Sequence, residues 1–262
     1  MVGSCFSDEI GEQMEQRYMQ VCCNPFGTLY NPLSIAKALT MDGVPPLVEY
    51  EGLWHSMMHH GSLSRAAKEE AYRVIRNSVL TMEQALEEAS VVIITFGTAW
   101  VYEVKSEKLK VKGERIVANC HKMPEQWFTR RRLTVEEIVA AWQPILEMYA
   151  DKRWIFTVSP IRHVRDGLHE NEISKATLLM AIERMIADQP LMVDISYFPS
   201  YEIMMDELRD YRFYADDLVH PSSLAVNYIW ERFVDTYCTN QTKNELVLQH
   251  KRWKHEHHIP LH

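Results

Sequence analysis

The sequence contains no run of about 18 or more apolar residues, the length that a membrane-spanning helix requires. Its longest apolar run, at 91–96, has the length of a buried strand instead. The first residues also lack the basic segment and the long apolar segment of a signal peptide, which a trimmed chain would lack too. We therefore expect a protein without a membrane span, located in the cytoplasm.

Cysteine is too scarce and too poorly spaced for a disulfide framework. The chain has five cysteines, an odd number, and Cys22 and Cys23 are adjacent. Reduced thiols in an intracellular setting are the expectation. A chain of 262 residues can bury roughly 70–75% of the surface that its unfolded form exposes, so its core needs neither disulfides nor a metal.

Positive charge is also in short supply, with 28 basic against 36 acidic residues and a net charge of −8. A nucleic-acid partner would require clustered lysine and arginine to neutralise its phosphates. The one cluster, at 130–132, is interpreted as a solvated face. We expect no nucleic-acid partner.

Glycine and proline are few, with 9 and 11 residues spread along the chain, and no repeat or low-complexity linker interrupts it. We expect one domain over residues 1–240, followed by a polar, histidine-rich tail over residues 241–262 that is either flexible or docked on the surface. The tail holds five of the 12 histidines, namely His250, His255, His257, His258 and His262.

Three apolar runs indicate the strands of a sheet. They lie near 91–96, 153–158 and 191–196, and none alternates with polar residues. Continuous apolar runs of this length are typical of strands that are covered on both faces, as in a parallel sheet. The sequence therefore predicts a mainly parallel sheet.

Helical segments separate these runs. Thr81 with Gln84 and Thr134 with Glu137 have the spacing of capping boxes, and 172–187 carries apolar residues at helical spacing. An alternation of strand and helix predicts a doubly wound α/β fold.

In such a fold, ligands bind beyond the carboxyl ends of the strands, so the chemistry is expected just after each apolar run. Ser4 lies at such a turn, ahead of a helix whose first turn carries Asp8 and Glu9. Backbone N–H groups and the helix dipole favour developing negative charge at a helix N-terminus. Ser4 is therefore a candidate nucleophile with half of an oxyanion hole beside it.

A nucleophilic serine needs a base, and an imidazole base needs a carboxylate that fixes its tautomer. Asp217 and His220 supply both within one short segment, and Pro221 suits the first position of the following helix. Asp217 as a helix cap and His220 as a surface residue are the competing interpretation. Asp217 and His220 indicate a catalytic pair only in combination with Ser4.

Two rival nucleophiles stand in the sequence. Cys5 offers a thiol, which is intrinsically more nucleophilic than a hydroxyl. Neighbouring residues at a turn point in different directions, so only one of Ser4 and Cys5 can face His220. Ser159 with His163 is a second rival pair, whose simpler interpretation is a Ser-Pro turn that closes a strand.

Six motifs stand out in the sequence, at 3–6, 24–32, 95–100, 119–121, 159–160 and 217–222. Taken together, they resemble those of the GSCFA family, over about residues 1–237. That family looks like a branch of the SGNH (GDSL-like) hydrolase superfamily. The resemblance implies a three-layer α/β/α, flavodoxin-like domain and an esterase or acyl-transfer chemistry that uses Ser, His and Asp.

The resemblance assigns roles to individual residues. Ser4 matches the nucleophile of the first block and is favoured over Cys5, while Asp217 and His220 match the last block. Gly27 matches the glycine of the second block, whose backbone N–H would help to hold the oxyanion.

The chain departs from the superfamily pattern in two places. The first block of the superfamily reads Gly-Asp-Ser, whereas here Gly3 directly precedes Ser4. The third block reads Gly-x-Asn, whereas the sequence after Gly97 and Thr98 has no Asn at that place. Gly97, Thr98 and Asn119 are assigned to the oxyanion or substrate site, with Thr98 and Asn119 as candidate substitutes for the missing side chain. A missing donor would cost about 10²–10³ in rate.

A histidine-rich segment is a further candidate for the substrate pocket. His55 and His59 have the i, i+4 spacing of zinc-binding helices, but Ser56 stands where a metalloprotease has its general base. We expect no metal and no cofactor there. His59, His60 and Trp54 are interpreted as pocket residues, with a half-buried helix end and ordinary core packing as the simpler alternatives.

These observations lead to three functional hypotheses. The first is a serine hydrolase that acts on O-acyl esters, with an acylated carbohydrate as one candidate substrate. The second is an O-acyltransferase that uses the same residues. The third is a carbohydrate-binding protein whose catalysis has lapsed, an interpretation that the incomplete third block supports.

The start of the chain leaves little room for a first strand. Only three residues precede Ser4, whereas a strand of about 5–6 residues is typical. We expect the natural gene product to carry additional residues that end in an apolar strand; otherwise this strand is a stub.

Overall fold

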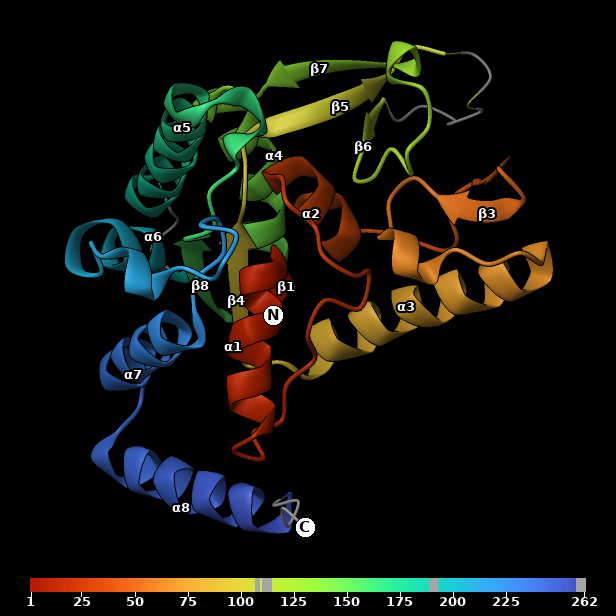
Figure 1. Ribbon diagram of the computed structural model, residues 1–262. Coiled ribbons are helices and arrows are strands. Elements are labelled where there is room, and N and C mark those ends of the chain that lie inside the picture. Colours follow the sequence, from red (N-terminus) through yellow and green to blue (C-terminus); the bar gives the residue numbers. More distant parts are fainter. Residues whose placement is uncertain (107–108, 110–114, 189–192, 258–262) are drawn as a thin grey trace.

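Four parallel strands form the central sheet, in the order β1, β4, β8, β9 (Figure 1). They are β1 (Val2–Gly3), β4 (Val91–Phe96), β8 (Arg153–Val158) and β9 (Asp194–Phe198). The computed structural model describes residues 1–106, 109, 115–188 and 193–257. The predicted strands at 91–96 and 153–158 are confirmed. The third predicted run starts outside the described residues, and β9 continues beyond it to Phe198.

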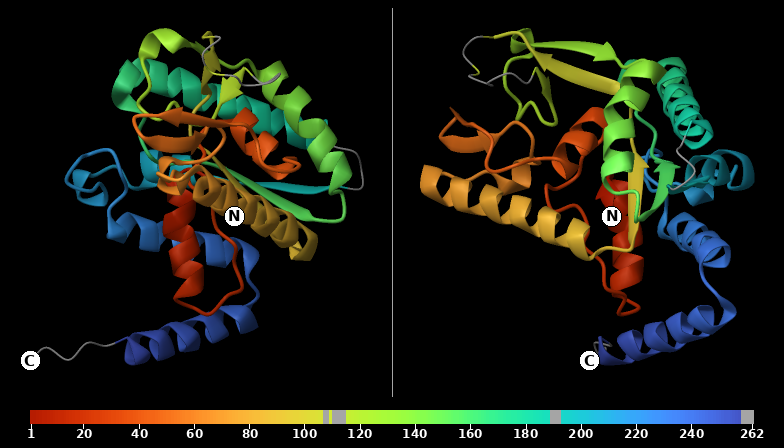
Figure 2. Two further views of the ribbon diagram at one scale, coloured as in Figure 1. Left: turned by 90° about the vertical axis from the view of Figure 1, so that its right-hand side faces the viewer. Right: turned by 180° about the vertical axis from the view of Figure 1, so that it is seen from behind.

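Helices cover both faces of this sheet, which confirms the expected three-layer α/β/α, flavodoxin-like arrangement (Figure 2). Ile94 and Phe156 belong to one core, while their neighbours Ile93 and Ile155 belong to the other, because successive side chains of a strand point to opposite faces. The first core contains α2 (Pro32–Leu39), α3 (Lys68–Glu88), α4 (Val135–Met148) and α5 (Leu168–Ala187). The second contains α1 (Cys5–Glu15), α7 (Ser223–Tyr237) and α8 (Asn240–Glu256).

One of the two expected capping boxes exists. The Thr134 hydroxyl accepts a hydrogen bond from the Glu137 backbone N–H at 3.2 Å, and the Glu137 carboxylate accepts one from the Thr134 N–H at 2.8 Å. The other is wrong, because α3 continues through Thr81. A single buried stripe that includes Val79 and Met82 spans this position and keeps the helix whole.

A smaller antiparallel sheet follows β4. It has the order β6, β5, β7 and comprises β5 (Trp100–Val104), β6 (Ile116–Val117) and β7 (Phe128–Arg132), and a separate hairpin joins β2 (Leu47–Tyr50) to β3 (Leu53–Ser56). The arginine cluster lies on β7, where Arg131 pairs with Glu103 at 2.6 Å and with Glu137 at 2.7 Å. Short helical turns complete the chain: η1 (Gly61–Leu63), η2 (Glu125–Trp127), η3 (Val164–Asp166), α6 (Ser200–Glu202), η4 (Ile203–Glu207) and η5 (Tyr211–Phe213).

The expected histidine-rich tail is helical over much of its length, because α8 runs to Glu256. Leu246 is buried in the second core, and the Arg252 guanidinium lies 5.5 Å from the centre of the Tyr18 ring on the segment after α1. The predicted tail residues His258 and His262 lie outside the described residues. Among the helices of the described ranges, none is both long and apolar enough to cross a membrane.

Gly3 marks the closest approach between β1 and β4. A Cβ atom there would lie 2.2 Å from the Thr95 carbonyl oxygen, and Gly3 has a φ of +151°. The next amide, of Ser4, donates to that same carbonyl at 3.3 Å. Glycine therefore lets the end of β1 dock against β4 and sets the position of the residues that follow.

Replacement of Gly3 by alanine should destabilise the protein strongly, since the contacted atom is backbone and cannot rotate away. Gly43→Ala is the matched control, because Gly43 has a φ of +73° with no atom within 4 Å of a new Cβ. We expect Gly43→Ala to cost about 1 kcal/mol from backbone strain alone and Gly3→Ala to cost about 2 kcal/mol more, from overpacking. Urea unfolding followed by circular dichroism measures both, and equal costs would contradict the close approach.

Candidate active site

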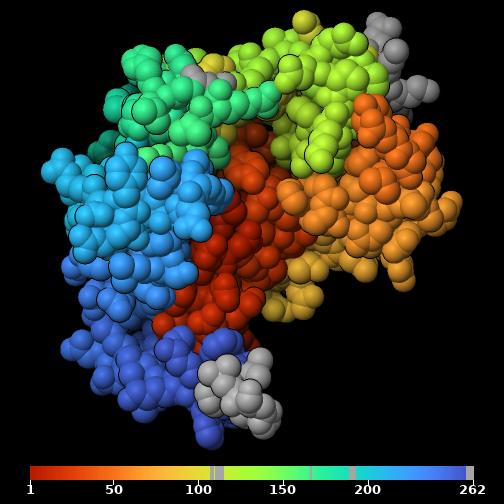
Figure 3. All heavy atoms as spheres, in the orientation of Figure 1, coloured from red at the N-terminus to blue at the C-terminus, as the bar shows by residue number. Residues whose placement is uncertain are grey.

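The candidate site lies at the carboxyl ends of the central strands, where β1 turns directly into α1. In Figure 3 the red N-terminal part of the chain is recessed between cyan and blue residues on one side and orange and lime residues on the other. Ser4 is the N-cap of α1 and Cys5 is its first residue. The loop at 211–222, which carries Asp217 and His220, meets this junction from the C-terminal half.

Asp217 and His220 form the expected carboxylate–imidazole pair. His220 Nδ1 lies 2.6 Å from Asp217 Oδ2, while Asp217 Oδ1 accepts hydrogen bonds from the Val219 and His220 backbone N–H groups, both at 2.9 Å. These backbone donors, together with the imidazole, lower the pKa of Asp217 to about 2. An ionised carboxylate only accepts hydrogen bonds, so Nδ1 carries the proton and Nε2 of the neutral ring is free to accept one.

The loop around this pair is held by its own backbone and by an arginine. Leu218 adopts a left-handed conformation with a φ of +58°, and the Ala215 N–H donates to the His220 carbonyl at 2.8 Å. The Arg162 guanidinium donates to the Tyr214 hydroxyl at 2.7 Å and lies 4.0 Å from the centre of that ring. No pattern in the sequence indicates this role of Arg162.

The helix after the loop starts later than expected. Ser222 is the N-cap of α7, and its hydroxyl accepts from the Ala225 N–H at 3.4 Å. Pro221 therefore lies just outside the helix, where it forms an antiparallel bridge with Tyr214, and not at the first helical position.

His220 faces Cys5 and not Ser4. Its Nε2 atom lies 3.9 Å from Cys5 Sγ. Ser4 is fully buried, and its hydroxyl accepts a hydrogen bond from the Phe6 backbone N–H at 3.3 Å. Among the residues that the structure describes, no hydrogen bond joins Ser4 to His220. The structure therefore does not bring these two residues together as expected, because the Ser4 side chain caps α1 and folds over the first turn of that helix.

The Cys5 thiol is protonated in its resting state. Burial raises its pKa, and the carboxylates of Asp8 and Glu9 act in the same direction. The backbone N–H groups of Cys5 and Phe6 oppose this effect. A thiol in this environment needs a base before it can act as a nucleophile, and His220 Nε2 is the base that it contacts.

The two third-block residues proposed as oxyanion donors have their amides engaged. Gly97 and Thr98 donate their backbone N–H groups to the Tyr30 carbonyl, at 2.8 and 3.0 Å. The Thr98 hydroxyl lies 3.1 Å from the Ser174 hydroxyl, at the start of α5. A Cβ atom at Gly97 would lie 3.3 Å from Nε2 of His163. These residues thus fix Tyr30 against the end of β4.

Gly27 has a conformational role. Its N–H donates to the Asn24 carbonyl at 2.7 Å, and it has a φ of +72°. A Cβ atom at this position would lie 2.3 Å from the Cβ atom of His60. Glycine here permits the turn and the close approach of His60. Because its amide is engaged within the turn, its expected role as an oxyanion donor stays a prediction.

The predicted helical spacing of His55 and His59 is wrong, since β3 ends at Ser56 and a turn follows. His59 is buried, stacks on Phe26 with ring centres 4.0 Å apart, and its Nδ1 lies 2.6 Å from the Ser56 hydroxyl. Burial lowers the pKa of His59 to about 3, so its ring is neutral. The His60 side chain caps η1 by accepting from the Ser62 N–H.

Asn119 and Trp54 lie beside this histidine segment. Asn119 Oδ1 accepts from the His121 N–H at 2.8 Å, and the Lys68 ammonium lies 4.7 Å from the centre of the Trp54 ring. Within the described ranges, no hydrogen bond or ring contact links them, His59 or His60 to Cys5 or His220. No group of three or more His, Cys, Asp or Glu residues among those described is placed to hold a metal ion.

The rival pair, Ser159 with His163, does not form a second nucleophilic site. The Ser159 hydroxyl is fully buried and accepts from the Ile161 N–H at 3.3 Å, which closes the turn after β8. The His163 N–H donates to Asn171 Oδ1 at 2.8 Å. His163 instead lines the site through its ring, which packs edge-on against Tyr30 with ring centres 5.8 Å apart.

Lys175 is a buried residue of α5 that nothing in the local sequence distinguishes from a surface lysine. Its ammonium donates to the Gly97 carbonyl at 2.7 Å and to the Ser159 carbonyl at 2.8 Å, and thereby joins the ends of β4 and β8. Burial lowers its pKa to about 7, while Glu172 and Cys5 act in the opposite direction.

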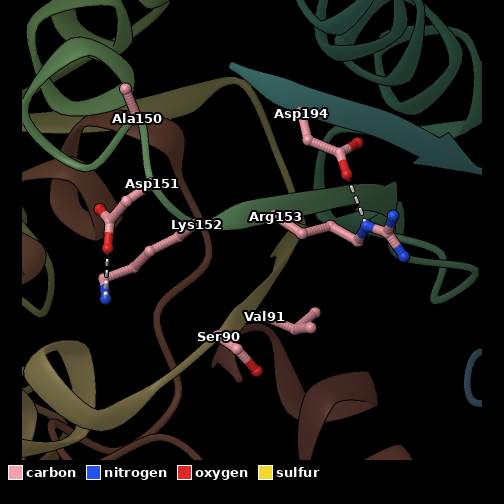
Figure 4. A pocket seen from close by; sticks show the side chains of 7 residues that line it. All are labelled: Ser90, Val91, Ala150, Asp151, Lys152, Arg153 and Asp194. Carbon is pink, nitrogen blue, oxygen red and sulfur yellow. Dashed lines mark hydrogen bonds and ion pairs between the residues drawn. The ribbon is translucent and has the colours of Figure 1, made fainter. Parts of the chain in front are cut away.

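A second hollow lies at the opposite edge of the sheet, at the amino ends of β4, β8 and β9 (Figure 4). Its charged groups are engaged with one another or with backbone. Arg153 donates to Asp194 at 2.6 Å, and Lys152 donates to the Ala89 carbonyl at 2.9 Å. Ligands of doubly wound folds bind at the other edge, so we place the site at Cys5 and His220.

Lys175 should make the stability of the protein depend on pH. From about pH 7 to the ordinary lysine pKa of 10.5, the unfolded chain binds a proton that the folded chain does not, so folding becomes more favourable as pH rises. Lys175→Met removes this contribution. The free energy of unfolding of the wild type, measured relative to that of the variant in urea, should therefore increase across this window. Parallel pH curves would contradict the burial of a titrating amine.

The comparisons with known proteins agree with the sequence motifs. The model described as the GSCFA family matches residues 1–233. No curated protein and no solved structure matches the chain. Because the family match covers most of the 262 residues and includes both Cys5 and the loop with Asp217 and His220, the chain belongs to the GSCFA family.

Proposed function

We propose that the protein is an acyl-transfer enzyme that hydrolyses O-acyl esters, with Cys5 as the nucleophile, His220 as the general base and Asp217 as the group that orients His220. The observation that carries the proposal is the series of contacts from Asp217 Oδ2 through the imidazole of His220 to Cys5 Sγ. Such a series is the geometry that nucleophilic catalysis requires.

In the first half of the reaction, Cys5 Sγ attacks the ester carbonyl carbon while its proton passes to His220 Nε2. The tetrahedral intermediate then collapses. The bond from carbon to the leaving oxygen breaks, and His220 returns the proton to the departing alcohol. The product is a thioester on Cys5, and the imidazole is neutral again.

In the second half, His220 takes a proton from water, and the resulting hydroxide attacks the thioester carbonyl. The carbon–sulfur bond breaks, and the sulfur regains its proton from His220. A sugar hydroxyl in place of this water would give the O-acyltransferase, with the same residues in the same roles. Asp217 remains ionised in both halves, because its pKa lies near 2.

The N-terminus of α1 supports the negative charge that develops. Cys5 is the first residue of this 11-residue helix, so the backbone N–H groups of the first turn and the positive end of the dipole lie beside the reacting sulfur. The backbone N–H groups of Cys5 and Phe6 oppose the effect of burial, which raises the pKa of the thiol, and thus favour a negative charge at this place.

Membership of the SGNH superfamily forms part of the proposal. With Cys5 as the nucleophile, Gly3-Ser4-Cys5 takes the place of Gly-Asp-Ser in the first block, so the glycine occupies its usual position. The departure that arose when Ser4 was taken as the nucleophile then disappears. Ser4 in turn occupies the middle position, where its hydroxyl caps the helix.

Replacement of Cys5 by alanine should abolish the hydrolysis of short-chain aryl esters, with a loss of about 10³-fold or more. Ser4→Ala should retain a Cys5-dependent activity and lose about 1 kcal/mol of stability with its cap. Cys120→Ala, at another partly buried cysteine, is the control and should behave as the wild type. Full activity of Cys5→Ala would overturn the thiol mechanism, and loss only in a folded Ser4→Ala variant would assign the reaction to the serine.

His220 should control the reactivity of the thiol in the absence of any ester. Because burial raises the pKa of Cys5, its alkylation by iodoacetamide at neutral pH depends on the neighbouring base. We expect His220→Ala to slow alkylation of the Cys5 peptide, measured by mass spectrometry, by about 10-fold or more. His169→Ala removes an exposed histidine from α5 and should leave the rate unchanged. Equal rates in all three proteins would separate His220 from the chemistry.

A further inference from the structure

We propose that Tyr30 is a catalytic residue whose hydroxyl stabilises the oxyanion of the tetrahedral intermediates. This inference rests on the proposed acyl-transfer function and assigns a donor that the third block, which lacks asparagine, does not supply. It also identifies Tyr30 as the reason why the amides of Gly97 and Thr98 point away from the reacting atoms.

The backbone places Tyr30 beside the nucleophile. The Leu29 N–H donates to the Gly3 carbonyl at 2.8 Å, so residues 28–30 run alongside the turn from β1 into α1. The Tyr30 carbonyl accepts from the amides of both Gly97 and Thr98, which fixes the residue at the end of β4. Tyr30 is thus tied to two neighbouring strands of the sheet, and little freedom remains for its side chain to leave the site.

The side chain of Tyr30 lies in the surroundings of the proposed nucleophile. The Thr28 and Cys5 side chains both act on the pKa of its hydroxyl, and its ring packs edge-on against His163 with ring centres 5.8 Å apart. A hydroxyl close to the attacking sulfur is also close to the oxygen of the carbonyl that the sulfur attacks, because this oxygen is only two bonds away from it. Oxyanion donors act over this range of distances.

The protonation state of Tyr30 suits a donor. Burial raises the pKa of its hydroxyl, and the neighbouring Cys5 and Asp8 side chains act in the same direction against the opposing effect of Thr28. The hydroxyl is therefore protonated throughout the pH range in which an imidazole serves as a base. A neutral donor that is already oriented requires no rearrangement when the oxyanion forms.

The other candidate donors lie elsewhere or already form hydrogen bonds. The Gly27 amide donates within its turn. Asn119 lies beside the histidine segment, where its oxygen accepts from the His121 N–H, and within the described ranges no hydrogen bond links it to Cys5 or His220. The Phe6 N–H is shared with the Ser4 hydroxyl. The Tyr30 hydroxyl and the Cys5 N–H therefore make the pair of donors that the geometry favours.

The test compares two reactions of the same sulfur. Ester acylation of Cys5 passes through an oxyanion, whereas alkylation by iodoacetamide is a direct displacement without one. We expect Tyr30→Phe to slow aryl-ester acylation of Cys5 by about 10²-fold and to leave the alkylation rate close to that of the wild type. Tyr197→Phe is the matched control, because its partly buried hydroxyl donates to Glu202 at 2.7 Å, away from Cys5.

Each outcome decides a separate question. Unchanged acylation in Tyr30→Phe, or an equal fall in acylation and alkylation, would overturn the role of Tyr30 while Cys5-dependent hydrolysis still stood. Ester hydrolysis that persists in Cys5→Ala, or a wild-type Cys5 that no aryl ester acylates, would overturn the proposed function and this inference with it.

Discussion

The hydrogen bond from the Phe6 amide to the Ser4 hydroxyl decides which of two side chains, Ser4 or Cys5, faces His220. Gly3 brings the end of β1 within reach of the Thr95 carbonyl, and the chain must then enter α1 at once. A serine at this place satisfies an otherwise unpaired amide and buries its own hydroxyl. Cys5 is the first side chain that the helix directs outward, and the loop with His220 meets it there.

The same demand for satisfied backbone groups shapes the rest of the site. The Lys175 ammonium donates hydrogen bonds to the carbonyls of Gly97 and Ser159 and so joins the ends of β4 and β8. The Tyr30 carbonyl accepts hydrogen bonds from two amides at the end of β4. Buried polar backbone groups must find such partners. Amides that are engaged in this way are not available to an oxyanion. In the proposed reaction, the donors therefore come from the helix N-terminus and from side chains.

The sequence allowed a correct prediction of the layers. The runs at 91–96 and 153–158 are continuously apolar, which indicates strands that are buried on both faces. It also identified Asp217 with His220, because both partners lie within one short loop. The sequence did not allow a prediction of the directions in which side chains point. Spacing does not tell which of Ser4 and Cys5 points outward, and nothing local distinguishes Lys175 from a surface lysine. The direction of Cys5 and the burial of Lys175 depend on contacts between distant segments. The prediction of a helix start at Thr81 was wrong for a related reason, because tertiary packing outweighed a local capping signal.

The electrostatic surroundings of Cys5 do not favour a preformed thiolate. Burial and two nearby carboxylates keep Cys5 protonated, whereas Asp217 stays ionised and fixes the proton on His220 Nδ1. In the resting site a protonated thiol lies beside the imidazole, and in the proposed reaction charge separates only when a carbonyl carbon is there to accept the sulfur electrons. Because the thiolate is the form that oxidants attack, a thiol held in this state resists adventitious oxidation. In the proposed reaction the reactivity of Cys5 thus depends on a bound acyl group, which is the order of events that acyl transfer requires.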